Sequence, residues 1–152
     1  MTATATPQDT LLQITHEMLV RASIEATFEA LLEQMGPGNE SPDGSPMPMV
    51  LEARPGGRWF RDLGSDNGHF WGHVQAIKRP SLLEVTGPLF LSTAAVSNLQ
   101  YRLKAAEGGT LVSFRHTAFG VVPDEMRKGT AIGWQALFDR ITAQAEGRRL
   151  TH

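Results

Sequence analysis

The sequence lacks cysteine, long apolar runs and a strong net charge, and each absence excludes a class of protein. Without cysteine there are no disulfides, no thiolate nucleophile and no cysteine-based zinc site. There is no run of about 18 apolar residues, so we expect no membrane span. A net charge of −2 leaves no basic patch for nucleic acid. The first ten residues have neither the basic nor the apolar part of a secretory signal, so the expected location is cytoplasmic.

The composition is that of a single globular domain. The chain has 152 residues, of which 41% are apolar and 20% are charged, and these values are ordinary for a folded protein with a sizeable core. The first residues are small and polar, which is typical of a disordered terminus. We therefore predict a disordered segment over residues 1–10, one domain over 11–147 and a tail over 148–152.

The first part of the chain combines a strand, a helix and a long loop. Residues 11–20 alternate, with apolar side chains on one face and His16 among them. Ser23 is a typical N-cap for the short amphipathic helix that follows. Seven of the thirteen residues in 36–48 are Gly or Pro, which predicts either a solvated loop or a flexible flap at the mouth of a pocket.

Six further strand patterns follow, and a long helix closes the chain. Turn residues separate the strands, and Gly108-Gly109 indicates a hairpin. Residues 123–146 carry an apolar stripe at helical spacing, which predicts that this face packs on the sheet. An antiparallel run of this kind excludes a doubly wound fold and indicates an α+β protein. The strands are expected at 49–54, after Gly56-Gly57, and at 68–78, 81–87, 96–106 and 110–117.

Five short motifs, taken in their order and spacing, point to a known family. They are VRASIEATF at 20–28, PGGRW at 55–59, GHV at 72–74, GGT at 108–110 and GWQAL at 133–137. The chain resembles the SRPBCC superfamily, also called START-like or birch-pollen-allergen-like, and within it the branch named for activators of heat-shock-protein ATPase homologues. The resemblance implies a helix-grip fold, in which a curved antiparallel sheet of about six to seven strands surrounds the long C-terminal helix and encloses a cavity.

The sequence departs from this family at one place. Relatives usually carry a second short helix and a Trp after the first helix, whereas this chain has the Gly- and Pro-rich loop at 36–48. The mouth of the cavity is therefore expected to be wider or more mobile. The family name refers to a eukaryotic co-chaperone with a further domain, so that activity is not carried over to this single domain.

The alternation of neighbouring strands predicts which side chains face the cavity. Tyr101 is on the apolar face of one strand, and Phe114 and His116 are on the apolar face of the next, so a hairpin at Gly108-Gly109 brings them to one side of the sheet. The helix adds Met126 and Trp134. The parity of the two Trp strands is open, because a bulge would change it. The predicted ligand-binding residues are Trp59, Trp71, Tyr101, Phe114, His116, Met126 and Trp134. No cofactor is expected.

Histidines and helical glycines leave alternatives open. His16 and His116 are either hydrogen-bonded core residues, polar anchors for a ligand, or a general base. His69 and His73 are four apart, about 13 Å on a regular strand, which is too far to share a metal, so no metal site is expected. Gly129 and Gly133 indicate either close packing of the last helix on the sheet or room for a ligand beneath it.

Three functions are compatible with the sequence. The favoured one is a cytoplasmic binding protein for a small hydrophobic or amphipathic molecule, lipids included. The second is an enzyme of the cyclase or hydratase type, with His116 or His16 as acid-base group and Tyr101 as donor. The third is a protein-interaction module that binds a chaperone or a second copy of itself as a homodimer. A fold by itself does not choose between them.

Overall fold

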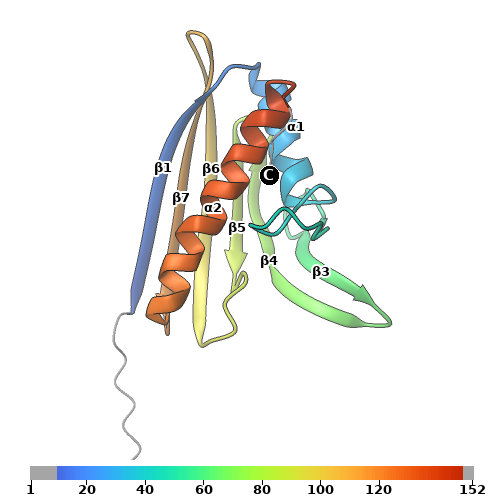
Figure 1. Ribbon diagram of the computed structural model, residues 1–152, viewed down its shortest axis with the longest axis vertical. Helices are drawn as coiled ribbons and strands as arrows, with labels where there is room; N and C mark the ends of the chain where they lie inside the picture. The colour runs from blue at the N-terminus through green and yellow to red at the C-terminus, as the bar shows by residue number, and fades with distance from the viewer. Residues whose placement is uncertain (1–9, 149–152) are drawn as a thin grey trace, which may run out of the picture.

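The computed structural model describes residues 10–148, which form a curved antiparallel sheet with two helices on its concave side (Figure 1). The seven strands lie in the order β1-β7-β6-β5-β4-β3-β2. This arrangement confirms the predicted α+β helix-grip fold. In chain order, the elements are β1 (Leu11–Val20), α1 (Ile24–Met35), β2 (Val50–Leu51), β3 (Arg58–Gly64), β4 (Asn67–Lys78), β5 (Leu82–Gly87), β6 (Ala95–Ala106), β7 (Gly109–Gly120) and α2 (Asp124–Ala145).

The described range covers the predicted domain and almost nothing of the predicted tails. Residues 1–9 and 149–152 lie outside it, so the disordered segment expected over 1–10 and the tail expected over 148–152 remain predictions. Within residues 10–148, neither helix is both long enough and apolar enough to cross a membrane.

The first helix begins where the sequence predicts. The Ser23 side chain accepts a hydrogen bond from the backbone N–H of Ala26 at 3.1 Å, which satisfies one of the free donors of the first turn. The acidic side chain of Glu25 in that turn is favourable beside the helix dipole. Helix α1 then buries Phe28 and Leu31 in the main core.

The last helix, α2, crosses the concave face of the sheet (Figure 1). It follows Pro123, and its bounds agree with the predicted 123–146 to within one residue. Thr130, Trp134 and Leu137 are buried, as the apolar stripe predicts. Phe138 and Arg140 are buried as well, although both lie outside that stripe.

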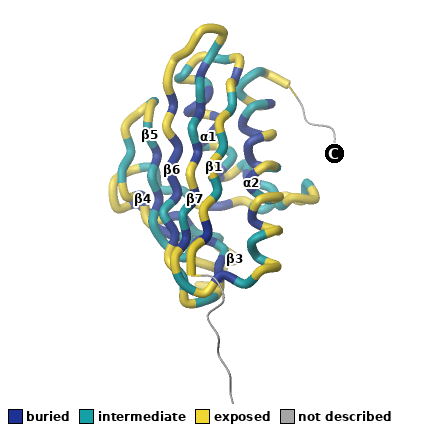
Figure 2. Tube along the Cα trace, turned by 90° about the vertical axis from the view of Figure 1, so that its left-hand side faces the viewer, coloured by how far each residue is buried: buried dark blue, intermediate teal, exposed yellow. Residues whose placement is uncertain are grey.

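The register of β6 and β7 confirms the predicted common face. Tyr101 is opposite Phe114, and Leu99 is opposite His116. All four side chains are at most 3% exposed. Figure 2 shows the same alternation of buried and exposed residues along the strands at this side of the sheet.

Strand β2 is shorter than predicted, whereas β3 begins directly after Gly56-Gly57, as expected. Strand β2 has only two residues instead of the six in 49–54, because the chain turns sharply through 52–57. Gly57 donates to the carbonyl of Arg54, and a Cβ atom at Gly57 would lie 1.8 Å from the Glu52 carbonyl oxygen. Between β3 and β4 the pairing shifts from Trp59–Gly72 to Phe60–Phe70, so Trp71 is the extra residue of a bulge.

Candidate functional site

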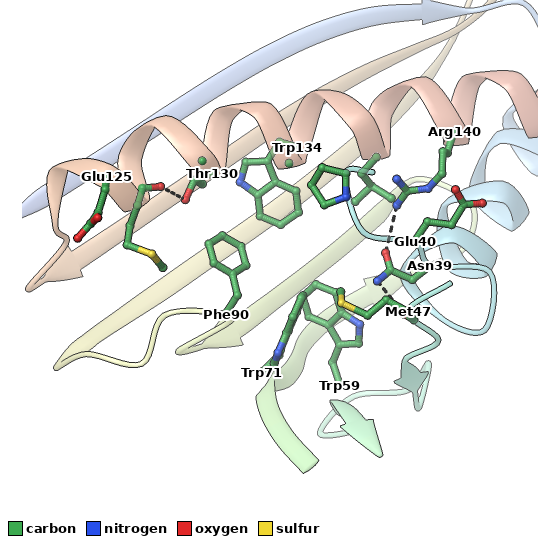
Figure 3. A pocket seen from close by; sticks show the side chains of 15 residues that line it. Asn39, Glu40, Met47, Trp59, Trp71, Phe90, Glu125, Thr130, Trp134 and Arg140 are labelled. Carbon is green, nitrogen blue, oxygen red and sulfur yellow. Dashed lines mark hydrogen bonds between the residues drawn. The ribbon is translucent and has the colours of Figure 1, made fainter. Parts of the chain in front are cut away.

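A cavity of about 310 Å³ lies beside α2 (Figure 3). Three parts of the chain enclose it: the loop after α1, the aromatic side chains of β3, β4 and the segment after β5, and one face of α2. The lining residues are Asn39, Glu40, Pro42, Met47, Trp59, Trp71, Phe90, Glu125, Met126, Gly129, Thr130, Gly133, Trp134, Leu137 and Arg140.

Four aromatic rings form an arc around the cavity. The ring centroids of Trp59 and Trp71 are 4.9 Å apart, those of Trp71 and Phe90 are 5.7 Å apart, and those of Phe90 and Trp134 are 5.8 Å apart. Each pair meets edge to face, a geometry that favours contact between aromatic quadrupoles. Each ring is therefore held by its neighbour, and the arc is a preformed apolar wall.

The indole N–H groups of this wall all point to protein acceptors. Trp59 donates to the carbonyl of Met35 at 2.8 Å, Trp71 to Nδ1 of His69 at 2.9 Å, and Trp134 to Nδ1 of His116 at 3.0 Å. An indole has one donor and no acceptor. The three tryptophans therefore present ring surface to the cavity and no free hydrogen-bonding group.

His116 is a fully buried connection between the sheet and α2. Because the Trp134 indole can only donate, Nδ1 of His116 is the acceptor and the ring proton is on Nε2. Nε2 lies 2.9 Å from the hydroxyl of Ser97, to which it donates. Burial lowers the pKa of His116 to about 4, so the imidazole is neutral at physiological pH, with both nitrogens engaged.

Four of the seven residues predicted to bind a ligand line the cavity, and three do not. Trp59, Trp71, Met126 and Trp134 belong to its wall. Tyr101, Phe114 and His116 lie on the expected concave face but in the closed layer between the sheet and α2. The ring centroid of Tyr101 is 5.0 Å from that of Phe114 and 6.5 Å from that of Phe138. Burial raises the pKa of the Tyr101 hydroxyl. These three residues were expected to line the cavity, but they do not reach it, because side chains of α2 such as Phe138 fill this part of the concave face.

Gly129 and Gly133 face open space on the cavity side of α2. A Cβ atom at either position would meet no described atom of a neighbouring element within 4 Å. Close packing on the sheet is therefore the wrong explanation for these glycines. They widen the cavity, as the second interpretation of the sequence requires.

The loop after α1 closes one end of the cavity. Its base is ordered by Asn39, which is buried and donates through Nδ2 to the carbonyl of Met47 at 3.0 Å. Residues 42, 43, 45 and 46 at its tip are exposed. The loop is thus solvated along much of its outer side, whereas Asn39, Pro42 and Met47 form part of the cavity wall.

Arg140 provides a buried positive charge at this end. The side chain is 7% exposed, and it donates through Nε to Gln34 Oε1 at 3.0 Å and through Nη2 to Asn39 Oδ1 at 3.2 Å. Burial lowers the pKa of Arg140, and the nearby charge of Glu40 acts in the opposite direction. No sequence pattern indicated the lining residues Arg140, Asn39, Glu40, Met47 and Phe90.

The other three histidines within residues 10–148 lie elsewhere. His16 stacks on Phe138 with ring centroids 4.6 Å apart, on the β1 side of α2. His69 accepts the hydrogen bond from Trp71. The ring of His73 lies against that of Phe70, with centroids 4.9 Å apart. None of these three is a lining residue. Within residues 10–148, no three His, Asp or Glu side chains are grouped as a metal site requires.

Comparison with known proteins agrees with this fold. Protein CV1439 from Chromobacterium violaceum has a TM-score of 0.66 at 18% identity, over 89% of this chain and 98% of that one. Ara h 8.0201 has a TM-score of 0.64 at 15% identity, over 91% and 99%. The di-domain ARO/CYC StfQ from the steffimycin biosynthetic pathway has a TM-score of 0.62 at 12% identity, over 91% of this chain and 51% of that one.

Sequence comparison identifies the family directly. None of the curated proteins matches the sequence. The family described as Activator of Hsp90 ATPase homolog 1-like protein matches residues 42–146. This range includes most of the cavity wall, from the tip of the loop to the end of α2. The chain therefore belongs to the Activator of Hsp90 ATPase homolog 1-like protein family.

Proposed function

We propose that this protein is a cytoplasmic binding protein for a small, mostly apolar molecule with an aromatic or conjugated ring. The observation that carries the proposal is the arc of four aromatic rings around a preformed cavity. A planar apolar ligand is expected to gain the most binding energy from this wall, because the wall presents aromatic ring surface and no free hydrogen-bond donor. Met47 and Met126 add flexible thioether side chains that adapt to irregular ligand shapes.

The size of the cavity limits the ligand. Pockets for small molecules enclose about 300–1,000 Å³, and this cavity of about 310 Å³ is at the lower end of that range. A compound of two fused or linked rings is compatible with this volume.

An enzymatic function receives less support from the geometry. StfQ is described as an ARO/CYC protein, but its likeness to this chain concerns the fold alone. A general base has to reach the substrate, whereas both ring nitrogens of His116 are engaged by Trp134 and Ser97. His16 is partly exposed, but it stacks on Phe138 and is not a lining residue. The histidines that the sequence offered for this role therefore favour a structural one.

The proposal is tested with the fluorescent probe N-phenyl-1-naphthylamine, which is apolar and has two linked aromatic groups. We expect the protein to enhance and blue-shift its emission in a saturable manner. Gly133→Leu places a side chain in the cavity and is expected to abolish this binding. Gly133→Ala is the matched control, because a single methyl group meets open space there and leaves most of the cavity free.

The two glycine variants separate cavity binding from surface binding. If the wild type and Gly133→Leu bind the probe equally well, the probe binds outside the cavity. If the wild type shows no saturable binding, the proposal is contradicted. Thermal unfolding of both variants shows that each is folded before binding is compared.

A further inference from the structure

The geometry points to a polar subsite, made by Arg140, Glu40 and Asn39, that recognises a neutral hydrogen-bonding group such as a hydroxyl or an amide on an aromatic ligand. This inference rests on the proposed function and specifies the class of ligand. The three residues share one end of the cavity, beside the helix–loop junction that follows α1 (Figure 3). The apolar wall of Trp134 and Phe90 extends from there toward Met126.

The first argument concerns charge. Arg140 is buried, and the carboxylate of Glu40 is close enough to act on its ionisation. The subsite therefore brings a buried positive charge and a partly exposed negative charge to the wall of a mostly apolar cavity. A ligand carboxylate is repelled by Glu40 and a ligand ammonium is repelled by Arg140, and either one loses hydration on entering a mostly apolar cavity. Neutral ligands avoid this cost.

The second argument concerns hydrogen-bond direction. A guanidinium only donates, and an ionised carboxylate only accepts. The Asn39 amide is already engaged, because its Oδ1 accepts from Arg140 and its Nδ2 donates to Met47. A ligand group placed here has to accept from Arg140 and can donate to Glu40. Hydroxyl and primary amide groups do both, whereas an ether or a ketone only accepts.

The third argument is that hydrogen-bond donors are concentrated at this end. The indole N–H groups of Trp59, Trp71 and Trp134 are directed to protein acceptors. The hydroxyl of Thr130 donates to the carbonyl of Met126 within α2. Among the described lining residues, Arg140 is thus the charged donor toward which the polar group of an aromatic ligand is oriented.

The test uses one ring system with four end groups: naphthalene, 2-naphthol, 2-naphthoate and 2-naphthylmethylammonium. Each compound competes with N-phenyl-1-naphthylamine for the wild-type protein at neutral pH. We expect 2-naphthol to bind roughly 10-fold more tightly than naphthalene, the lower limit for a hydrogen bond to a charged group. Both charged compounds are expected to bind more weakly than 2-naphthol.

Two variants assign this selectivity to the subsite. Glu40→Gln removes the negative charge and keeps the shape, so 2-naphthoate is expected to gain affinity relative to 2-naphthol. Arg140→Gln removes the positive charge, so 2-naphthylmethylammonium is expected to gain instead. Arg140 also connects α1 to the loop, so Glu40→Gln decides the question if Arg140→Gln does not fold.

The outcomes separate this inference from the proposed function. If all four compounds compete equally, or if 2-naphthoate binds most tightly, the neutral subsite is disproved while binding in the cavity stands. If no compound displaces the probe and the probe itself binds no more weakly to Gly133→Leu, the proposed function fails and the subsite with it. Selectivity that is unchanged in Glu40→Gln also overturns the assignment.

Discussion

Trp134 of α2 donates its indole N–H to Nδ1 of His116 on β7 at 3.0 Å. One side of the indole faces the cavity, and its nitrogen joins the helix to the sheet. The same side chain therefore contributes to the ligand wall and to the stability of the fold. This dual position links the binding properties of the protein to the protonation of a buried histidine.

The stability of the protein is expected to fall at acidic pH because the imidazole of His116 is buried in its neutral form. Its pKa is about 4 in the folded protein against 6.5 for a solvated histidine side chain, so the unfolded chain binds the proton more readily. The contribution to stability is complete above pH 6.5 and is lost as the pH falls through 4. It amounts to about 3 kcal/mol by linkage. Urea unfolding at several pH values, compared with His116→Gln, isolates this contribution, and equal slopes in both proteins would contradict it.

Removing only the indole donor is expected to destabilise the fold. Trp134→Phe keeps an aromatic ring in the wall and leaves Nδ1 of His116 without its partner, at a cost of about 1–3 kcal/mol for a buried unsatisfied group. Thermal or urea unfolding measures the change. Ser97→Ala removes the partner on Nε2 and serves as the comparison. If Trp134→Phe leaves the free energy of unfolding unchanged, the hydrogen bond contributes little to stability.

Leu137 tests the packing of α2 on the sheet. Its side chain is 5% exposed, and Leu137→Ala is expected to lower the free energy of unfolding by about 2–5 kcal/mol. The control is Ile132→Ala on the opposite face of α2, where the side chain is 64% exposed and a change within about 0.5 kcal/mol is expected. Similar losses in both variants would mean that the helix is rotated from the observed orientation.

The elements were predictable because their signals are local, whereas the composition of the site was not. Strand alternation depends on neighbours two residues apart, so the common face of Tyr101, Phe114 and His116 could be read from the sequence. Whether that face lines a cavity or a closed core depends on Phe138, which approaches from a distant helix. No periodicity of β6 or β7 contains that information.

Arg140 illustrates the same limit for polar residues. Its position on α2 gives no sign of burial, because the side chain is covered only when the loop at 36–49 folds back and Asn39 reaches it. The Gly- and Pro-rich composition of that loop indicates irregular structure but not where the loop packs. The parity of Trp59 and Trp71 likewise depends on a bulge that the sequence made possible without locating it.

Two glycines in different surroundings give opposite predictions for the same substitution. Gly133→Ala on α2 meets open space and is expected to stabilise the protein by up to about 1 kcal/mol, the difference in helix propensity. Gly57→Ala brings a Cβ atom to 1.8 Å from the Glu52 carbonyl oxygen, so the turn before β3 has to shift and the protein loses stability. Equilibrium unfolding of both variants checks the signs, and a destabilised Gly133→Ala would contradict the open space beside α2.

The hydroxyl of Tyr101 is expected to contribute nothing to stability, or to reduce it. The residue is 1% exposed, and its oxygen has no hydrogen-bond partner among the described residues. A buried hydroxyl without a partner loses hydration and gains no bond in return. Tyr101→Phe is therefore expected to leave the free energy of unfolding unchanged or to raise it by about 1 kcal/mol. The ring contacts with Phe114 and Phe138 remain in the variant, so packing does not confound the comparison. If urea unfolding instead shows a clear loss of stability, the Tyr101 hydroxyl has a hydrogen-bond partner in solution.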